Sequence, residues 1–300
     1  MHYNHPQNIN AFLEYLKFQK RYSSNTICAY ETDLVSVSNY LSTQFNENDL
    51  NKATSIFIRS WLAGLKEEGI SSRSINRKIS TLKSYYKFQL RKGEVKLSPM
   101  VSVISPKSGR RLPMYVEKEG IDKLFSEIEF ERGFKGITDK LILFLLYNTG
   151  IRRSELLNLK LSQVDFDNKN IKVFGKGKKE RIIPISSELS LEINNYSKEK
   201  SNLENVVNSS VLLVTNKGKQ LTTGYIYNVV KKYLSQVSTI EKRSPHILRH
   251  TFATHLMSNG ADLNAVKELL GHSSLAATQV YTHNNIEKLK EIHKKAHPKS

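Results

Sequence analysis

Six side chains in the second half of the chain have the types that phosphodiester cleavage needs. They are Arg152, Lys176, His246, Arg249, His272 and Tyr281. Guanidinium groups are permanently charged and present forked donors, which suits the charge that spreads over a pentacoordinate phosphorus. A phenol becomes a useful nucleophile when neighbouring cations favour the phenolate. The set predicts attack on a phosphodiester by a protein oxygen, with no metal or cofactor required.

The string TGIRRSEL (149–156) contains the first arginine. We expect Arg152 just after a Thr-Gly turn, at the start of a helix where backbone N–H groups can also face an anion. Arg153 should point about 100° away on the same helix, toward the surface or a nucleic-acid backbone. Glu155 has two interpretations: it pairs with a neighbouring arginine and holds it, or it is an ordinary helix carboxylate.

The string HILRH (246–250) places His246 and Arg249 three residues apart, so on a helix they share a face. Arg249 would be the second phosphate clamp, and His246 would accept a proton or hydrogen-bond a phosphate oxygen. His250 falls one step on and should support the core or the side chains around the site. With His255 these histidines suggest zinc, but no HExxH string and no cysteine pair accompany them. We therefore expect no metal site.

The string GKGKKER (175–181) lies between two predicted strands. It lacks the spacing of a nucleotide-binding loop and does not precede a helix. A glycine-flanked lysine at a hairpin tip can instead deliver a proton to a leaving oxygen, and Lys176 is the candidate. We expect Lys178, Lys179 and Arg181 to contact a nucleic-acid backbone. The phenol, Tyr281 in QVYTH, lies on a short predicted helix that begins after GHSS (271–274).

The chain of 300 residues has a formal net charge of +18, and both residues 1–105 and residues 106–300 are basic. Such a surplus favours a polyanionic partner, although a solvated basic surface is the plainer explanation. Acidic lipid fits less well because no basic amphipathic anchor helix stands out. The longest apolar run, residues 141–147, is too short to cross a bilayer. We expect no export and no disulfide, with Cys28 as a small buried residue in a cytoplasmic protein.

The first hundred residues predict a bundle of four or five helices. Hydrophobic spacing and capping residues indicate segments at 11–20, 25–41, 55–69 and 71–93, with Ser23 or Ser24 capping the second and Gly93 ending the last. The last segment has Arg73, Arg77, Lys78 and Lys83 on one side. That side is either a phosphate-contacting face or an ordinary solvated one.

Residues 98–113 hold three of the seven prolines and several basic residues, which indicates a linker. We predict a helical DNA-binding domain at 1–105, a basic linker at 106–113 and a catalytic domain at 114–300, the two domains closing around a duplex. The catalytic domain should have a small antiparallel sheet in a mainly α fold. The expected helices are 117–130, 137–148, 224–237, 246–260, 263–271, 275–283 and 286–295, with helix and turn over 152–166, two strands within 170–185 and a further strand within 211–221.

The strings, in this order, resemble the tyrosine recombinase (lambda-integrase-like) family, with the nearest likeness to bacterial Xer recombinases. The match is densest over residues 244–283. The resemblance implies a SAM-like N-terminal bundle and phosphate binding by both arginines. It also implies general-acid, base and phosphate-ligand roles for Lys176, His246 and His272, and Tyr281 as nucleophile. No substitution occurs at any of the six positions.

Family members cut and rejoin DNA through a 3′-phosphotyrosyl link as tetramers on two DNA sites. The resemblance therefore implies double-stranded DNA as partner, a homo- or hetero-tetramer with a paralogous recombinase, and a DNA translocase as activator. It also implies that residues 286–300 dock on a neighbouring protomer. Xer-type resolution of chromosome dimers is the leading function. The alternatives are a mobile-element integrase, a non-catalytic DNA-binding protein and a topoisomerase-like relaxing enzyme.

Overall fold

The chain forms two units, Met1–Arg111 and Leu112–Ser300, each with its own hydrophobic core. The computed structural model describes residues 6–107, 114–175, 180–204 and 210–271. Within these ranges, no helix combines the length and the apolar character that crossing a membrane requires.

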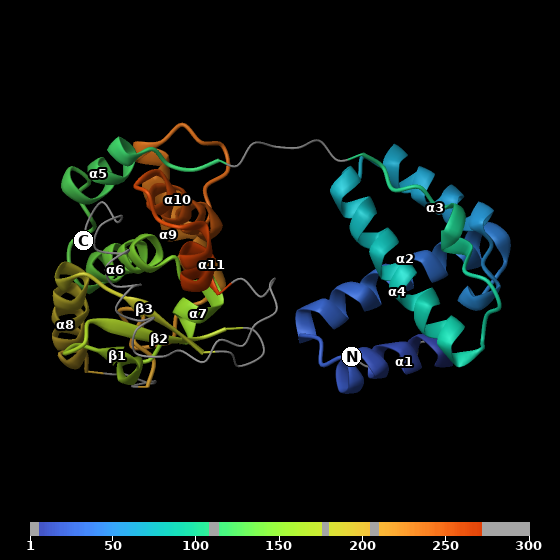
Figure 1. Cartoon of the computed structure of the whole chain (residues 1–300), viewed down its shortest axis with the longest axis horizontal. Coiled ribbons are helices and arrows are strands. Elements are labelled where there is room, and N and C mark those ends of the chain that lie inside the picture. The colour runs from blue at the N-terminus through green and yellow to red at the C-terminus, as the bar shows by residue number, and fades with distance from the viewer. Residues whose placement is uncertain (1–5, 108–113, 176–179, 205–209, 272–300) are drawn as a thin grey trace. The chain divides into compact units, whose positions relative to one another are not determined.

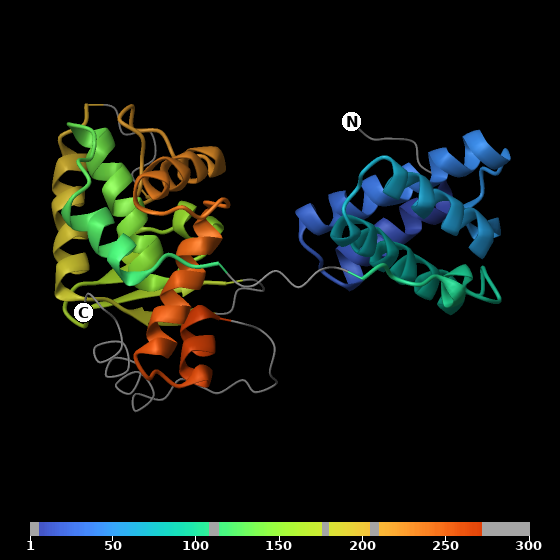
Figure 2. The same cartoon turned by 90° about the horizontal axis from the view of Figure 1, so that it is seen from above.

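The N-terminal unit is built from helices (Figures 1 and 2). They are α1 (Gln7–Glu14), the π-helical turn η1 (Tyr15–Gln19), α2 (Ser24–Phe45), η2 (Leu50–Lys52), α3 (Ser55–Glu67), α4 (Ser72–Lys92) and η3 (Pro99–Ser102). The four predicted helical segments are confirmed. Ser23 caps α2 by accepting the Thr26 N–H, and Gly93 ends α4 in the left-handed region, with φ of 75°. The helices enclose a core that is rich in aromatic rings, among them Trp61, Tyr85 and Tyr86.

Cys28 is exposed on α2, so the prediction of a buried residue is wrong. The buried face of α2 contains Leu34 and Val37, and the same helical face continues back through Tyr30 and Ile27. Cys28 follows Ile27 and points about 100° away from that face. The apolar residues around Cys28 predicted the helix, but not which of its residues point inward.

The basic side of α4 is divided between solvent and an internal ion pair. Arg73 and Lys83 are exposed, whereas the side chain of Lys78 is only 12% exposed and its Nζ lies 3.0 Å from the buried carboxylate of Asp33. Arg77 donates to both oxygens of the same carboxylate. Lys78 therefore joins α4 to α2 and does not belong to a free phosphate-contacting face.

The C-terminal unit is mainly α with one small sheet, as predicted. Its elements are α5 (Lys118–Ser126), α6 (Phe134–Thr149), α7 (Arg153–Leu157), η4 (Leu161–Gln163), β1 (Val164–Asp165), β2 (Asn170–Phe174), β3 (Glu180–Pro184), α8 (Ser187–Ser201), α9 (Thr223–Val237), α10 (Pro245–Ser258) and α11 (Leu263–Leu270). The strands pair antiparallel in the order β1-β2-β3. The pairing of β2 with β3 runs from Asn170 opposite Pro184 to Phe174 opposite Glu180.

Helix α6 forms the centre of this unit. Its residues are buried without a break from Leu141 to Thr149, and it packs against α8, α9 and α10 (Figure 1). Helix α11 packs against both α10 and β3. The ends of α6, α10, α11 and β3 are thereby brought toward the start of α7.

Three differences from the sequence-based expectation concern this unit. The further strand predicted within 211–221 forms only isolated bridges, Lys160 with Val211 and Val214 with Gln220. One cause is that the Tyr196 hydroxyl of α8 donates to the Val214 carbonyl and accepts from the Val214 N–H, taking both backbone groups of that residue. The third strand of the sheet is instead β1, where we expected helix and turn. Helix α8 was not predicted, and the helices expected at 275–283 and 286–295 lie outside the described residues.

Candidate active site

Arg152 is the N-cap of α7, as the sequence predicted for the start of that helix. Its backbone N–H donates to Glu155 Oε2 at 2.8 Å, and its Nη1 donates to Oε1 of the same carboxylate at 2.8 Å. The Arg152 side chain remains 30% exposed. Glu155 thus fixes both ends of this residue, which confirms the first of the two interpretations of this carboxylate. Arg153, the next residue, is exposed.

Arg249 comes from α10 and lies deeper than Arg152, with a relative exposure of 7%. Its Nη1 donates to the Gly150 carbonyl at 2.6 Å, just beyond the end of α6. Burial, then the charges of Arg152 and Arg181, lowers the pKa of Arg249 to about 9. The side chain still carries its charge at neutral pH. The lowered pKa reflects the energetic cost of burying this charge close to two other cations.

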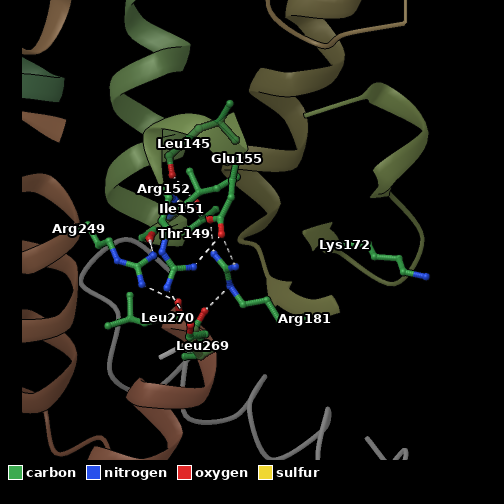
Figure 3. A network of polar contacts seen from close by, with 12 residues as sticks. Leu145, Thr149, Ile151, Arg152, Glu155, Lys172, Arg181, Arg249, Leu269 and Leu270 are labelled. Carbon is green, nitrogen blue, oxygen red and sulfur yellow. Dashed lines mark hydrogen bonds and ion pairs between the residues drawn. The ribbon is translucent and has the colours of Figure 1, made fainter. Parts of the chain in front are cut away.

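The consecutive carbonyls at the end of α11 accept hydrogen bonds from arginines of three different elements. The pairs are Arg181 with Leu269 at 2.8 Å, Arg249 with Leu270 at 2.5 Å, and Arg152 with Gly271 at 2.7 Å. Figure 3 shows the guanidinium groups converging on this helix end. The C-terminus of a helix carries partial negative charge, so it stabilises the cations that gather there. His272 is the next residue in the chain.

Arg181 is a residue whose role the sequence interpretation assigned wrongly. We expected it to contact a nucleic-acid backbone, but its side chain is 4% exposed and donates to both oxygens of Glu155, at 2.9 and 2.7 Å. A signal was present in the strand period: Arg181 and Ile183 alternate on one side of β3, and both are buried. We call Arg152, Glu155, Arg181 and Arg249 the arginine cluster.

The arginine cluster has three positive charges and one negative charge. Burial alone would raise the pKa of Glu155, but the hydrogen bonds and charges of Arg181 and Arg152 outweigh it and lower that pKa to about 2. The carboxylate therefore stays ionised under all ordinary conditions. The surplus of positive charge around it, with Arg152 partly open to solvent, suits this cluster to bind an anion.

His246 lies in the first turn of α10, three residues before Arg249, so the predicted shared face of this helix is confirmed. Its side chain is exposed. Desolvation, then the charges of Arg249, Arg153, Arg152 and Lys242, lowers the pKa of this imidazole below its usual 6.5. A neutral imidazole at the edge of a cationic pocket is able to accept a proton.

The other two histidines of α10 do not form a site with His246. His250 is half-buried. His255 is buried, and its Nδ1 lies 3.1 Å from the hydroxyl of Tyr147 on α6. Among the described residues, no group of three or more His, Cys, Asp or Glu side chains is arranged to hold a metal ion.

Three of the six predicted site residues lie outside the described residues: Lys176, His272 and Tyr281. The described chain nevertheless comes close to two of them in sequence. Strand β2 ends at Phe174 and β3 begins at Glu180, so Lys176 belongs to the connection of this antiparallel hairpin. The end of α11, which receives the arginines, immediately precedes His272. The predicted roles of these three residues remain predictions.

Comparison with known proteins gives matches over nearly the whole chain. Residues 115–288 match the phage integrase family, and residues 9–93 match the family described as phage integrase, N-terminal SAM-like domain. Tyrosine recombinase XerC of Oceanobacillus iheyensis is 38% identical over 295 residues, covering 97% of this chain and 96% of that protein. The protein of the same name from Chlorobaculum parvum is 36% identical over 315 residues, covering 97% and 94%. The resemblance predicted from the sequence is confirmed.

Solved structures share the fold at lower identity. The XerH site-specific recombinase bound to palindromic difH substrate has a TM-score of 0.71 at 24% identity, covering 94% of this chain and 83% of that one. The Tn1549 transposon integrase in complex with transposon right end DNA also has a TM-score of 0.71, at 19% identity, covering 95% and 98%. At such identities the likeness extends to the fold alone.

Proposed function

This chain belongs to the phage integrase family of tyrosine recombinases, and we propose that it cuts and rejoins double-stranded DNA at specific sites through a 3′-phosphotyrosyl intermediate. The observation that supports this most strongly is the placement of Arg152 and Arg249. They come from different helices, yet they are anchored on adjacent carbonyls, those of Gly271 and Leu270, directly before His272 in the chain. Two anchored guanidiniums are suited to bind the nonbridging oxygens of one phosphate.

The proposed reaction exchanges one phosphoester for another. The Tyr281 phenol oxygen forms a bond to phosphorus while the bond from phosphorus to the 5′ oxygen breaks. His246 accepts the phenolic proton or binds a phosphate oxygen, and Lys176 donates a proton to the leaving 5′ oxygen. His272 hydrogen-bonds the phosphate, and Arg152 and Arg249 stabilise its charge. The attack of a 5′-hydroxyl on the phosphotyrosine reverses these steps, so rejoining consumes no nucleotide.

Relatives bound to DNA support DNA as the partner of this chain as well. The structures of XerH and of the Tn1549 integrase contain difH substrate and transposon end DNA, respectively. We assign DNA binding to residues 1–105 and catalysis to residues 114–300, joined by the basic linker 106–113. A tetramer on two DNA sites, with a paralogous recombinase or with further copies of this chain, is the proposed assembly. Residues 286–300 would dock on the neighbouring protomer, and a DNA translocase would activate the complex.

Resolution of chromosome dimers is the proposed biological role, because the relatives at 36–38% identity are named tyrosine recombinase XerC. Such a role places the protein in the cytoplasm with the chromosome. The Tn1549 transposon integrase is 19% identical to this chain. An identity that low supports a shared fold but not a shared biological role. No specific observation favours the non-catalytic or topoisomerase-like alternatives.

The experiment that tests the function begins with a footprint of the full-length protein on genomic DNA. A duplex built from the protected site, with a nick that lets the cleaved end diffuse away, traps the covalent complex. We expect an adduct with the wild type and none with Tyr281→Phe. The proposal fails if the wild type forms no adduct on the site that it protects. Relaxation of plasmids that lack the site would favour the topoisomerase-like alternative instead.

A further inference from the structure

Arg181 is enclosed within the protein, and no role in the reaction has been assigned to it. It lies on β3, and its side chain has a relative exposure of 4%. The Nε and both Nη atoms all donate to protein acceptors: Nε to the Leu269 carbonyl, and the two Nη atoms to the two oxygens of Glu155. A side chain so enclosed, with all three of its nitrogens already donating to protein acceptors, is not available to a DNA phosphate.

The acceptor that Arg181 shares with Arg152 is the carboxylate of Glu155. Oε1 accepts from the Nη1 atoms of both arginines, and Oε2 accepts from the Arg152 backbone N–H and from Arg181 Nη2 (Figure 3). Glu155 therefore has little freedom to turn. Because Arg152 is held through its backbone and its side chain by that same group, the orientation of Arg152 depends on the orientation of Glu155.

We infer that Arg181 is a positioning residue for DNA strand cleavage, which acts through Glu155 to aim the guanidinium of Arg152 at the scissile phosphate. This inference rests on the proposed function. With Arg181 in place, the carboxylate is saturated and Arg152 keeps donors for a phosphate. Without Arg181, each oxygen of the buried carboxylate keeps one donor, Arg152 Nη1 on Oε1 and the Arg152 backbone N–H on Oε2, and the guanidinium of Arg152 turns toward the charge that Arg181 no longer balances. The phosphate then loses a correctly placed donor although every proposed catalytic side chain is still present.

The hydrogen bond from Arg181 Nε to the Leu269 carbonyl gives Arg181 a positioning contact with α11 as well as with Glu155 on α7. It ties β3 to the end of α11, whose next carbonyls anchor Arg249 and Arg152. At Gly271 an added Cβ would lie 3.1 Å from Arg181 Cδ, which shows how closely that turn is fitted to the Arg181 side chain. Arg181 thus sets the distance between the hairpin, α7 and α11 at the point where the phosphate would bind.

The test compares single-turnover rates of adduct formation on the nicked duplex at saturating DNA for the wild type, Arg181→Met and Arg181→Lys. A misplacement of about 1 Å costs roughly 100-fold in rate, so we expect a loss of that order for Arg181→Met. Arg181→Lys keeps the charge but not the two-pronged contact, so it should retain part of the rate. Lys172→Met is the matched control, because Lys172 on β2 forms an exposed ion pair with Glu180 and points away from the cluster (Figure 3). It should react at the wild-type rate.

A double-mutant cycle separates positioning from a general loss of structure. If Arg181 acts through Arg152, then Arg181→Met introduced into the Arg152→Lys protein should cost less than about threefold, because the group it positions is already altered. A full 100-fold loss in both backgrounds, or no loss in either, would overturn the inference. If Arg181→Met does not fold, as judged by circular dichroism, Arg181→Lys replaces it in the cycle. A wild type that forms no adduct would instead refute the proposed function.

Discussion

Single side chains in this site differ mainly in how far the protein has already fixed them. Arg249 is buried and bound to two carbonyls, whereas Arg152 is 30% exposed and held by Glu155 and Gly271. His246 is exposed, and its pKa is lowered by desolvation and by the cations around it. Hydrogen bonds within the protein therefore hold both guanidinium groups in place in the absence of DNA. The imidazole of His246 is neutral at pH 7 and can accept a proton.

The lowered pKa of His246 gives a prediction for the pH dependence of strand cleavage. The rate should fall as the pH drops through that pKa, below 6.5, because protonation removes the base. Arg153→Gln removes one of the positive charges that disfavour the protonated imidazole, so the pKa rises and the acidic limb moves to higher pH. Single-turnover cleavage at saturating DNA, measured across pH 5–8, checks this. A limb that stays in place, or that moves to lower pH, contradicts the role of His246 as the base.

For the site residues that the structure describes, the sequence predicted the local placement well and the surroundings less well. Arg152 at a helix start and the shared face of His246 and Arg249 follow from local spacing, and both are confirmed. The burial of Arg181 depends on Glu155, 26 residues away, and on Leu269, 88 residues away. Local spacing cannot reveal such a pair, and only the alternation along β3 hints that this arginine faces inward.

At the scale of elements, the turn between α6 and α7 decides whether the site can form. Gly150 has φ of +57°, and an added Cβ would lie 2.5 Å from Phe252 Cδ1 and 2.9 Å from Leu270 Cδ2. Its carbonyl also anchors Arg249. The turn therefore joins α6, α10 and α11 at one residue that has no side chain.

Gly150→Ala tests the packing at this turn. The left-handed backbone and the overlap with Phe252 should together lower the free energy of unfolding of the C-terminal unit by roughly 2–5 kcal/mol. Urea unfolding followed by circular dichroism measures the change. Gly64→Ala is the matched control: an added Cβ there meets nothing within 4 Å, and helix α3 should gain about 0.5–1 kcal/mol. Equal stability for Gly150→Ala and the wild type would show that the turn is not tightly packed.

Elements with strong hydrophobic periodicity were predictable, and those defined by long-range contacts were not. The helices within residues 11–93 and within 224–271 follow the pattern of their apolar residues. Helix α8 has a similar signal in Leu189, Ile193 and Tyr196, which are buried at helical spacing. That spacing could have predicted α8. The two-residue strand β1 is too short to give a periodic signal, and it exists because β2 lies beside it.

At the scale of the whole molecule, the net charge of +18 is the dominant property. Some of the 46 Lys and Arg side chains pair with buried carboxylates inside the protein, as Lys78 and Arg181 do. These pairs leave the surplus of +18 unchanged, because the acidic residues are already counted in it, and the surplus is available to a polyanion. A protein that binds a duplex in this way releases counterions as it neutralises phosphates.

Binding to the cognate duplex should therefore weaken steeply with salt. If roughly 6–10 phosphates are neutralised, affinity should fall by about 10³–10⁵ between ~50 and ~200 mM salt. Fluorescence anisotropy with a labelled duplex, in the Tyr281→Phe protein so that no DNA is cut, measures this slope. An affinity that hardly changes over this range would argue against binding through contacts with many phosphates.

The central claim is that a DNA strand is transferred onto Tyr281, and peptide mapping of the trapped adduct tests it most directly. After digestion of the complex formed on the nicked duplex, mass spectrometry identifies the modified peptide, and end-labelling identifies the chemistry of the cut. The account predicts a single adduct at Tyr281, joined to the 3′ phosphate, with a free 5′-hydroxyl on the released strand. An adduct on another of the 14 tyrosines, or a link to a 5′ phosphate, would contradict it.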